Sequence, residues 1–392
     1  MAVTSESFIG FLEGVLGEAA HTVPLHEPRF AGHEWDYVRE CLDTGWVSSV
    51  GKYVDEFERR LAELCGVRHA VAVVNGTAAL QVALMMVGVR PGDEVLIPAL
   101  TFVATANAVV HAGAVPHLVD SEIRTLGIDA ARLDDYLDRI AERRAGGAVN
   151  RQSGRRIAAV VPMHTFGHPV DMDKLAEVAR RWRLSIVEDA TESLGSRYRG
   201  RPAGSLGDIA ALSFNGNKIV TTGGGGAVVT DDPALARHAK HVTTTAKLAH
   251  RWAFDHDEIG YNYRLPNINA ALGCAQLEQL DGFLAAKRRL AGRYETACRE
   301  VSGFRFVKEP AEAVSNYWLN AVLLDRADLP LRNHLLDAAN DAGYHVRPVW
   351  TPMHRLPMFA EAPRMDLAVT EDIVDRLINL PSSARHGLDE VG

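Results

Sequence analysis

Short apolar runs alternate along this chain with segments whose apolar residues recur at helical spacing. Ala70–Val74 is a continuous apolar run, typical of a parallel strand buried on both faces, and Ala78–Val87 is rich in helix-forming residues. Further strands are predicted at 94–97, 115–119, 157–161, 184–187 and 227–230, and further helices at 101–112, 171–182 and 233–247. This alternation predicts an α/β fold with a mostly parallel central sheet flanked by helices.

The two ends of the chain carry other patterns. Apolar residues from Phe8 to Leu16 recur at helical spacing and predict an amphipathic helix that packs on the body or on a partner subunit. Other predicted elements are helices at 32–42, 53–65, 267–298 (one long helix or a bent pair) and 330–342, and strands at 317–324 and 345–350. We therefore expect an N-terminal helix (1–23), a large domain (24–270) and a smaller C-terminal α+β domain (271–392). The polar and basic segment 139–156 is predicted as a solvated surface loop, with a phosphate contact as the alternative.

Composition narrows the possible functions. The net charge of −8 argues against general nucleic-acid binding, which needs a basic surface. No apolar run is long enough to span a bilayer and the acidic N-terminus is unlike a signal peptide, so a cytoplasmic enzyme without a membrane partner is expected. The four cysteines lie far apart without a CxxC pair, which indicates reduced thiols rather than a zinc site or a disulfide framework. His164 and His168 have no carboxylate or cysteine at matching spacing, so no metal site is expected.

Candidate chemistry gathers where predicted strands end. Gly76 and Thr77 follow the first strand and begin a helix, where free N–H groups can hold an anion, although Thr77 could be a simple helix cap. Phe102 follows the next strand. It could be a core residue, or an aromatic ring that stacks on the ring of a ligand. Asp189 ends a later strand. It could cap the next helix, or it could hold a proton on the nitrogen of a pyridine ring. Ligands of such sheets bind beyond the carboxyl ends of the strands.

Lys218 stands alone between small and polar residues, in a stretch that follows the apolar run Ile209–Leu212 and ends in the glycine run Gly223–Gly226. Taken alone, this stretch has two interpretations. Lys218 could be a surface lysine beside a tight turn, or its amine could be desolvated and therefore suited to Schiff-base chemistry. The order of lysine and glycines excludes a nucleotide loop of the GxxxxGK[ST] type. An anion cradle, an aromatic ring, a carboxylate and a lone lysine at successive strand ends together meet the needs of pyridoxal 5′-phosphate.

Between Pro24 and about Leu280, the chain resembles the DegT/DnrJ/EryC1/StrS sugar aminotransferases, which are fold-type I pyridoxal phosphate enzymes. The matching segments are Asn75-Gly76-Thr77-Ala78-Ala79-Leu80, Pro91-Gly92-Asp93-Glu94-Val95, Thr101-Phe102-Val103-Ala104-Thr105-Ala106-Asn107, Glu188-Asp189-Ala190, Gly204-Ser205-Leu206-Gly207-Asp208, Ser213-Phe214 with Lys218, and Gly260-Tyr261-Asn262-Tyr263-Arg264. Within the family, His26-Glu27-Pro28, the segment 43–52 and Met163–His168 are most similar to the branch of LegC and the UDP-N-acetylbacillosamine aminotransferases.

The resemblance implies a role for each matching position. Lys218 would form the Schiff base and shuttle the proton between the substrate carbon and the cofactor, Asp189 would hold the pyridinium proton, and Phe102 would stack on the ring. Glu192 stands where the family usually has a glutamine near the cofactor's 3′-oxygen, which leaves its role open.

Phosphate contacts and assembly are implied in the same way. Gly76, Thr77 and Ser213 match contacts to the cofactor phosphate. Asn262 matches a phosphate contact given across a dimer interface, so the resemblance implies a homodimer with shared active sites. The segment Arg347–His354 is expected to close over the substrate.

The expected reaction moves the amino group of L-glutamate to C4 of a nucleotide-linked 4-keto-6-deoxy sugar, for glycan or polysaccharide biosynthesis. A UDP-linked sugar is the first expectation, with a GDP- or dTDP-linked sugar as the alternative. A dehydratase of the same fold would carry a histidine in place of Lys218. A non-catalytic regulator would need a DNA-binding module, for which neither the acidic N-terminus nor the net charge of −8 gives support.

Overall fold

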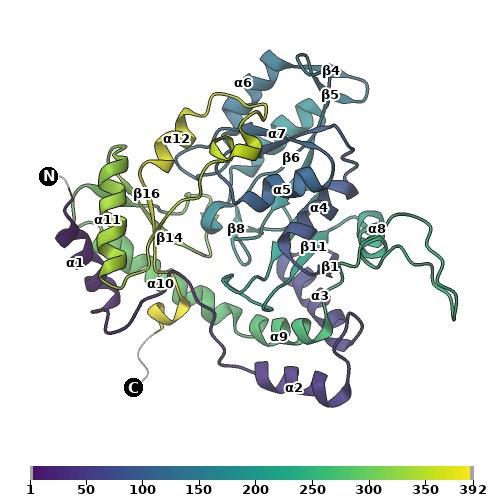
Figure 1. Ribbon diagram of the computed structural model, residues 1–392, viewed down its shortest axis with the longest axis horizontal. Coiled ribbons are helices and arrows are strands. Elements are labelled where there is room, and N and C mark those ends of the chain that lie inside the picture. The colour runs from purple at the N-terminus through teal and green to yellow at the C-terminus, as the bar shows by residue number, and fades with distance from the viewer. Residues whose placement is uncertain (1–2, 389–392) are drawn as a thin grey trace.

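A mostly parallel sheet forms the centre of the molecule, as predicted. The computed structural model describes residues 3–388. Within them, the nine-stranded sheet has the order β1-β11-β10-β7-β6-β2-β3, and a hairpin of β4 and β5 extends it beside β6 (Figure 1). The strands are β1 (His69–Val73), β2 (Glu94–Pro98), β3 (Val115–Val119), β4 (Ala141–Arg144), β5 (Gly147–Asn150), β6 (Arg156–Val160), β7 (Ser185–Asp189), β10 (Ile209–Ser213) and β11 (Gly226–Thr230). The run from β10 to β3 is parallel, whereas β11 pairs antiparallel with both β10 and β1.

Helices cover this sheet because its strands are apolar on both faces. Val95, Leu96 and Ile97 of β2 are fully buried. The covering helices are α4 (Gly76–Met86), α5 (Val103–His111), α6 (Ala130–Ile140), α7 (Met172–Trp182) and α8 (Pro233–Thr243). Aspartates accept hydrogen bonds from the first-turn amides of α6, α7 and α8 and thereby fix where these helices begin.

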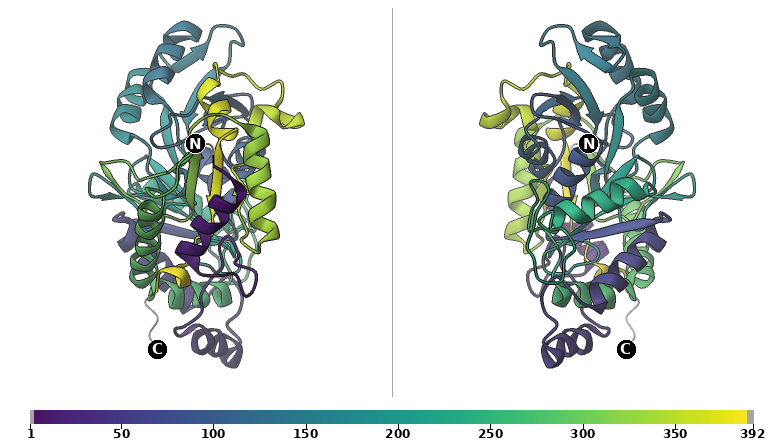
Figure 2. Two further views of the ribbon diagram at one scale, coloured as in Figure 1. Left: turned by 90° about the vertical axis from the view of Figure 1, so that its left-hand side faces the viewer. Right: turned by 90° about the vertical axis from the view of Figure 1, so that its right-hand side faces the viewer.

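A second, antiparallel sheet lies in the C-terminal part of the chain. Its order is β12-β14-β16-β15, formed by Phe304–Phe306, Asn320–Leu324, Leu377–Leu380 and Arg347–Pro348. Helix α1 (Ser5–Leu16) packs beside α11 (Leu329–Asp341) and α10 (Leu280–Ala297), as Figures 1 and 2 show. Its buried residues are Phe8, Phe11, Leu12 and Val15, so the predicted apolar face docks on the body of its own chain. Other elements are α12 (Ala368–Val374) and a small sheet of β8 (Arg197–Tyr198), β9 (Arg201–Pro202) and β13 (Ala313–Val314).

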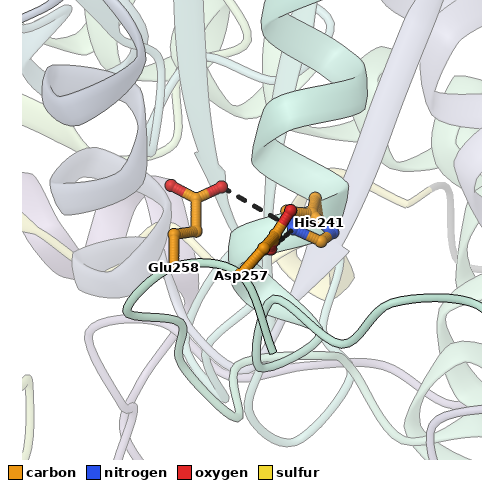
Figure 3. Close-up of side chains that lie close together, drawn as sticks. All are labelled: His241, Asp257 and Glu258. Atoms are coloured by element: carbon orange, nitrogen blue, oxygen red, sulfur yellow. Dashed lines mark hydrogen bonds and ion pairs between the residues drawn. The ribbon is translucent and has the colours of Figure 1, made fainter. Parts of the chain in front are cut away.

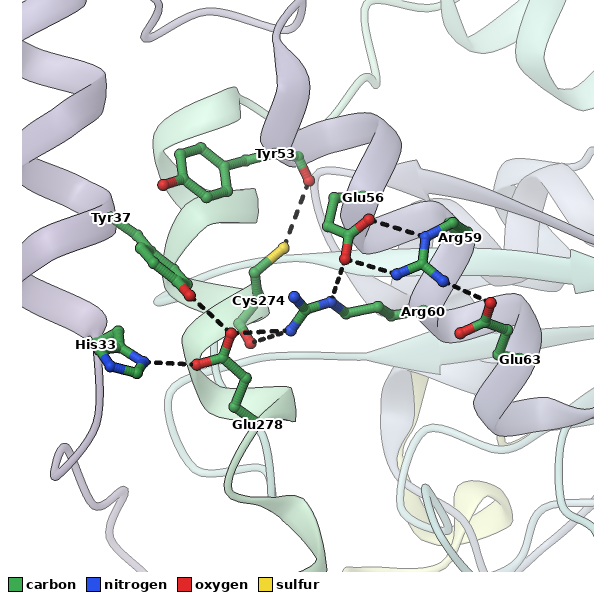
Figure 4. Close-up of polar contacts among 9 residues, drawn as sticks. All are labelled: His33, Tyr37, Tyr53, Glu56, Arg59, Arg60, Glu63, Cys274 and Glu278. Carbon is green, nitrogen blue, oxygen red and sulfur yellow. Dashed lines mark hydrogen bonds and ion pairs between the residues drawn. The ribbon is translucent and has the colours of Figure 1, made fainter.

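Three further helices are joined by the polar network in Figure 4: α2 (Glu34–Thr44), α3 (Lys52–Cys65) and α9 (Asn267–Leu277). Glu278, directly after α9, accepts a hydrogen bond of 2.8 Å from the Tyr37 hydroxyl and one of 3.1 Å from Arg60. Arg60 of α3 also donates to Glu56. Helices α9 and α10 are the bent pair that the 267–298 pattern allowed.

The prediction of a solvated loop at 139–156 is wrong. Residues 141–150 form the β4–β5 hairpin, and β5 pairs with β6. The structure buries Asn150, whose side chain donates to the buried Glu94 carboxylate at 2.9 Å, and this tertiary contact is invisible in a polar sequence pattern.

Three predicted elements are shorter than expected. The helix expected at 233–247 ends at Thr243, because Thr245 and Ala246 have positive φ angles. The strand expected at 317–324 begins at Asn320, because Tyr317 has a positive φ angle. In the segment expected as a strand at 345–350, only Arg347–Pro348 pairs with a neighbouring strand.

The division into domains near residue 270 stays a prediction. Among residues 3–388, no helix combines the length and the apolar character needed to cross a membrane.

Candidate active site

A cavity of about 270 Å³ lies where the ends of β7 and β10 meet the starts of α4 and α5. Most predicted site residues line it: Gly76, Thr77, Phe102, Asp189, Glu192, Ser213 and Lys218. The C-terminal part of the chain adds Trp318, which sequence reasoning did not single out, and Trp350, which lies in the segment 347–354 expected to close over the substrate. The structure therefore joins residues that are far apart in sequence around one space, as expected at the carboxyl ends of parallel strands.

The predicted anion cradle is built by close backbone packing. Asn75 caps α4 by accepting the Ala78 N–H at 2.8 Å, so Gly76 and Thr77 form the first turn at the cavity. A Cβ at Gly76 would lie 2.9 Å from the Cβ of Ser213, and a Cβ at Gly226 would lie 2.5 Å from the carbonyl carbon of Asn75. Glycine is required at both positions by this approach. The glycine run thus bends at Gly223, where φ is +77°, and also lets β11 reach the start of α4.

Asp189 is held by hydroxyl groups from two sides. One carboxylate oxygen accepts from Thr105 Oγ1 at 2.8 Å and the other from Thr191 Oγ1 at 2.7 Å. Thr101 bonds in turn to Thr105 at 2.7 Å, and Asp189 is 2 % exposed. These donors keep a buried carboxylate in one orientation toward the cavity. The sequence pointed to Asp189 but not to its threonine partners. Thr105 lies in the family-like segment 101–107, whereas Thr191 lies outside every matching segment.

Lys218 faces a carboxylate and an indole ring. Its Nζ lies 3.2 Å from Glu192 Oε1 and 3.7 Å from the centroid of the Trp318 ring. Trp318 is fixed by its own indole N–H, which donates to the Asn217 carbonyl at 2.8 Å. The Lys218 side chain is 12 % exposed, so its amine stands in a narrow, partly aromatic site rather than on the surface.

Glu192 is buried beside this lysine. Its second carboxylate oxygen accepts the Phe166 N–H at 3.0 Å, and the residue is 3 % exposed. Burial raises the pKa of Glu192 to about 7; Lys218 and the Phe166 N–H oppose that rise, and the nearby Asp189 carboxylate adds to it.

Two predicted residues lie at the margin. Phe102 is half exposed at the cavity, with its ring centroid 6.3 Å from that of Trp350, and its stacking on a cofactor ring stays a prediction. Asn262 is exposed and bridges to Thr244 at the base of the loop between α8 and α9, outside the cavity lining. Its contribution to a partner's site stays a prediction.

Other polar groups have local partners. A hydrogen bond of 2.9 Å joins His164 to the buried Glu188. The four cysteines are buried and have free thiols: Cys41, Cys65, Cys274 and Cys298. Outside the cavity, His241 lies close to Asp257 and Glu258 (Figure 3). A hydrogen bond of 2.6 Å joins His241 to Asp257 and lowers the pKa of that carboxyl, so local hydrogen bonding explains why these three side chains lie together.

The cavity fits pyridoxal phosphate. Gly76 leaves beside Ser213 the space that a side chain would fill, at a helix N-terminus suited to a phosphate. A buried carboxylate and a sheltered amine complete the donor set that the cofactor requires.

Comparisons with known proteins agree with this geometry. The profile of the DegT/DnrJ/EryC1/StrS aminotransferase family matches residues 28–392. The chain is 41 % identical over 371 residues to GDP-perosamine synthase of Caulobacter vibrioides, covering 94 % of each protein. It is 38 % identical to GDP-perosamine synthase of Escherichia coli O157:H7, covering 92 % of this chain and 93 % of that protein. The crystal structure of aminotransferase TlmJ from Streptoalloteichus hindustanus superimposes with a TM-score of 0.84 at 28 % identity, covering 94 % and 95 % of the two chains. The chain thus belongs to the DegT/DnrJ/EryC1/StrS family of sugar aminotransferases, enzymes that depend on pyridoxal phosphate.

Proposed function

We propose that this enzyme transfers the amino group of L-glutamate to C4 of a nucleotide-linked 4-keto-6-deoxy sugar. The observation that carries the proposal is the sheltered Lys218 amine in the same cavity as the buried Asp189 and the Gly76 cradle. A lysine is retained where a dehydratase would carry histidine, which favours transamination.

The bound cofactor supplies an aldehyde that carries nitrogen from one substrate to the other and a ring that accepts electrons. The residues of this chain hold and move protons around it. Asp189, fixed by Thr105 and Thr191, accepts the hydrogen bond of a ring N–H and keeps that proton in place. Gly76, Thr77 and Ser213 hold the phosphate at the start of α4. With the cofactor bound, the Lys218 Nζ would carry a proton between the substrate carbon and the cofactor, once for the amino donor and once, in the reverse direction, for the keto sugar.

The nucleotide of the acceptor is inferred from the relatives. The proteins from Caulobacter vibrioides, Escherichia coli O157:H7 and Vibrio cholerae are named GDP-perosamine synthases. Their similarity extends over at least 92 % of this chain, so a GDP-linked keto sugar is the first candidate. The UDP-linked sugar, expected from the resemblance of residues 26–28 and 43–52, is the second candidate.

A homodimer is part of the proposal. Large apolar side chains are exposed on α2 and the segment after it, including Trp35 (84 %) and Trp46 (58 %). The loop between α8 and α9 extends from the body in Figure 1 and exposes Trp252 (73 %) and Phe254 (74 %). Large apolar side chains exposed in this way are typical of subunit interfaces. A second copy that covered it would place Asn262 near the partner's cofactor.

The test is a panel of GDP-, UDP- and dTDP-linked 4-keto-6-deoxy sugars with L-glutamate as donor. Formation of 2-oxoglutarate and of an amino sugar is measured by mass spectrometry. We expect turnover with the GDP-linked sugar, bleaching of the cofactor's visible absorbance by glutamate, and loss of both in Lys218→Ala. Full turnover by Lys218→Ala would overturn the mechanism, and preference for the UDP-linked sugar would overturn only the choice of nucleotide.

A further inference from the structure

The contact between Glu192 and Lys218 has a chemical consequence that goes deeper than the proposed function, on which it rests. Glu192 has two polar partners: its Oε2 accepts the Phe166 N–H at 3.0 Å and its Oε1 lies 3.2 Å from the Lys218 Nζ. The Glu192 side chain is 2 % exposed and that of Lys218 is 12 % exposed, so bulk water reaches this pair poorly.

An amine attacks a carbonyl only after it has lost its proton, so a buried lysine needs a nearby group to receive that proton. Glu192 is the carboxylate within hydrogen-bonding distance of the Lys218 Nζ. The titratable groups around the pair are the Asp189 carboxylate at the end of β7 and the buried His26, whose pKa is lowered well below its usual value by burial and, to a smaller extent, by Lys287 and Lys218. Asp189 is already held by two threonine hydroxyls, which leaves Glu192 as the free acceptor.

We propose that Glu192 is a catalytic residue that receives the proton of Lys218 when the lysine amine becomes a nucleophile, and returns it when the amine is released. The transfer is balanced within the pair: the Lys218 ammonium and the Glu192 carboxylate become a free amine and a neutral carboxylic acid. No proton leaves the site and no oxidant or reductant is required.

Local physics makes both forms accessible. The charged pair is stabilised by its Coulomb attraction and by the Trp318 ring 3.7 Å from the ammonium. The neutral pair avoids the cost of two buried charges. Because burial raises the pKa of Glu192 to about 7, this carboxyl holds a proton far more readily than an exposed glutamate. A glutamine at this position could accept the Phe166 N–H but could not take a proton.

The two possible roles of Glu192 predict different pH profiles for the reactivity of Lys218. If the proton passes to Glu192, the fraction of free amine stays nearly constant while the pair holds one proton, between about pH 7 and 9. If Glu192 only pairs with the ammonium, the proton must go to water, and the free-amine fraction rises about tenfold per pH unit.

The experiment uses the full chain without added cofactor and a trace amount of acetic anhydride as the probe. Acetylation of Lys218 is quantified by peptide mass spectrometry against an added peptide with a single lysine. We expect a nearly flat profile for the unaltered chain and a rise of about tenfold per pH unit for Glu192→Gln. Glu295→Gln, at an exposed ion pair with Lys308, is the matched control and should leave the profile flat.

A tenfold rise per pH unit in the unaltered chain, with faster labelling of Glu192→Gln at every pH, would overturn the proposal. If Glu192→Gln fails to fold, the slope of the unaltered chain decides alone. The readout needs neither cofactor nor sugar. A flat profile without transamination would therefore refute the proposed function and leave the proton transfer standing, and a steep profile with transamination would do the reverse.

Discussion

At the scale of single residues, the candidate active site depends on side chains and backbone that neighbouring residues hold in one position. Asp189 is surrounded by hydroxyl donors, and Gly76 is in contact with Ser213. The sequence showed these residues at the ends of strands but left each with an ordinary structural explanation. Their shared cavity, and the contact between Glu192 and Lys218, became visible only in three dimensions.

Asp189→Asn is expected to lower kcat by about 100-fold or more, because an amide cannot hold a proton on the ring nitrogen as a carboxylate does. Steady-state transamination kinetics measure the effect. Asp173→Asn serves as the control and should retain full activity, because Asp173 lies on α7 and forms only an exposed ion pair with Arg199. Equal activity of the two variants would contradict the role of Asp189.

Gly76→Ala is expected to weaken cofactor binding at least about tenfold, because its Cβ would lie 2.9 Å from Ser213 Cβ and force the cradle open. Equilibrium titration with pyridoxal phosphate measures the affinity. Gly10→Ala is the matched change: that glycine lies within α1, with no atom within 4 Å of an added Cβ. It should leave affinity unchanged and stabilise α1 by up to about 1 kcal/mol. Unchanged affinity in Gly76→Ala would disprove the close-packing argument.

At the scale of elements, strongly periodic segments were predicted well. The apolar face of α1 and the buried strands of the central sheet were predicted from the spacing of apolar residues alone. A helix buried on one face has apolar residues at helical spacing, and a strand buried on both faces is a continuous apolar run. The β4–β5 hairpin was missed, because its polar residues bond to buried partners such as Glu94 rather than to water. The strand predicted at 317–324 and the helix predicted at 233–247 are shorter than expected because Tyr317 and Thr245 have positive φ angles. The residue types at these positions gave no sign of that conformation.

Leu12→Ala tests the docking of α1. Leu12 is fully buried among α1, α10 and α11, so the cavity left by its side chain should lower the free energy of unfolding by about 2–5 kcal/mol. Urea denaturation followed by circular dichroism measures this change. Leu16→Ala, on the partly exposed side of the same helix, should have a clearly smaller effect. Equal losses in the two variants would show that α1 does not dock as described.

At the scale of the whole molecule, the apolar residues on α2 and on the loop after α8 remain uncovered in a single chain. Replacing Trp252 and Phe254 together by serine is expected to shift the proposed dimer toward monomers and to lower activity, since the proposed contact of Asn262 with the partner's site would be lost. Sedimentation velocity measures the shift at fixed protein concentration. Met358→Ser, at a residue 62 % exposed elsewhere on the surface, should leave the assembly unchanged. A monomeric, fully active unaltered protein would refute the shared site.

The sequence by itself determined the fold class, the succession of strands and helices along the chain, the family and the residues that end each strand, because these depend on local periodicity and on short segments. The tertiary structure decided how those residues meet: Trp318 above Lys218, Glu192 beside it, and the threonines around Asp189. These contacts join residues up to a hundred positions apart, and their energies depend on burial and distance, which no single segment of sequence contains.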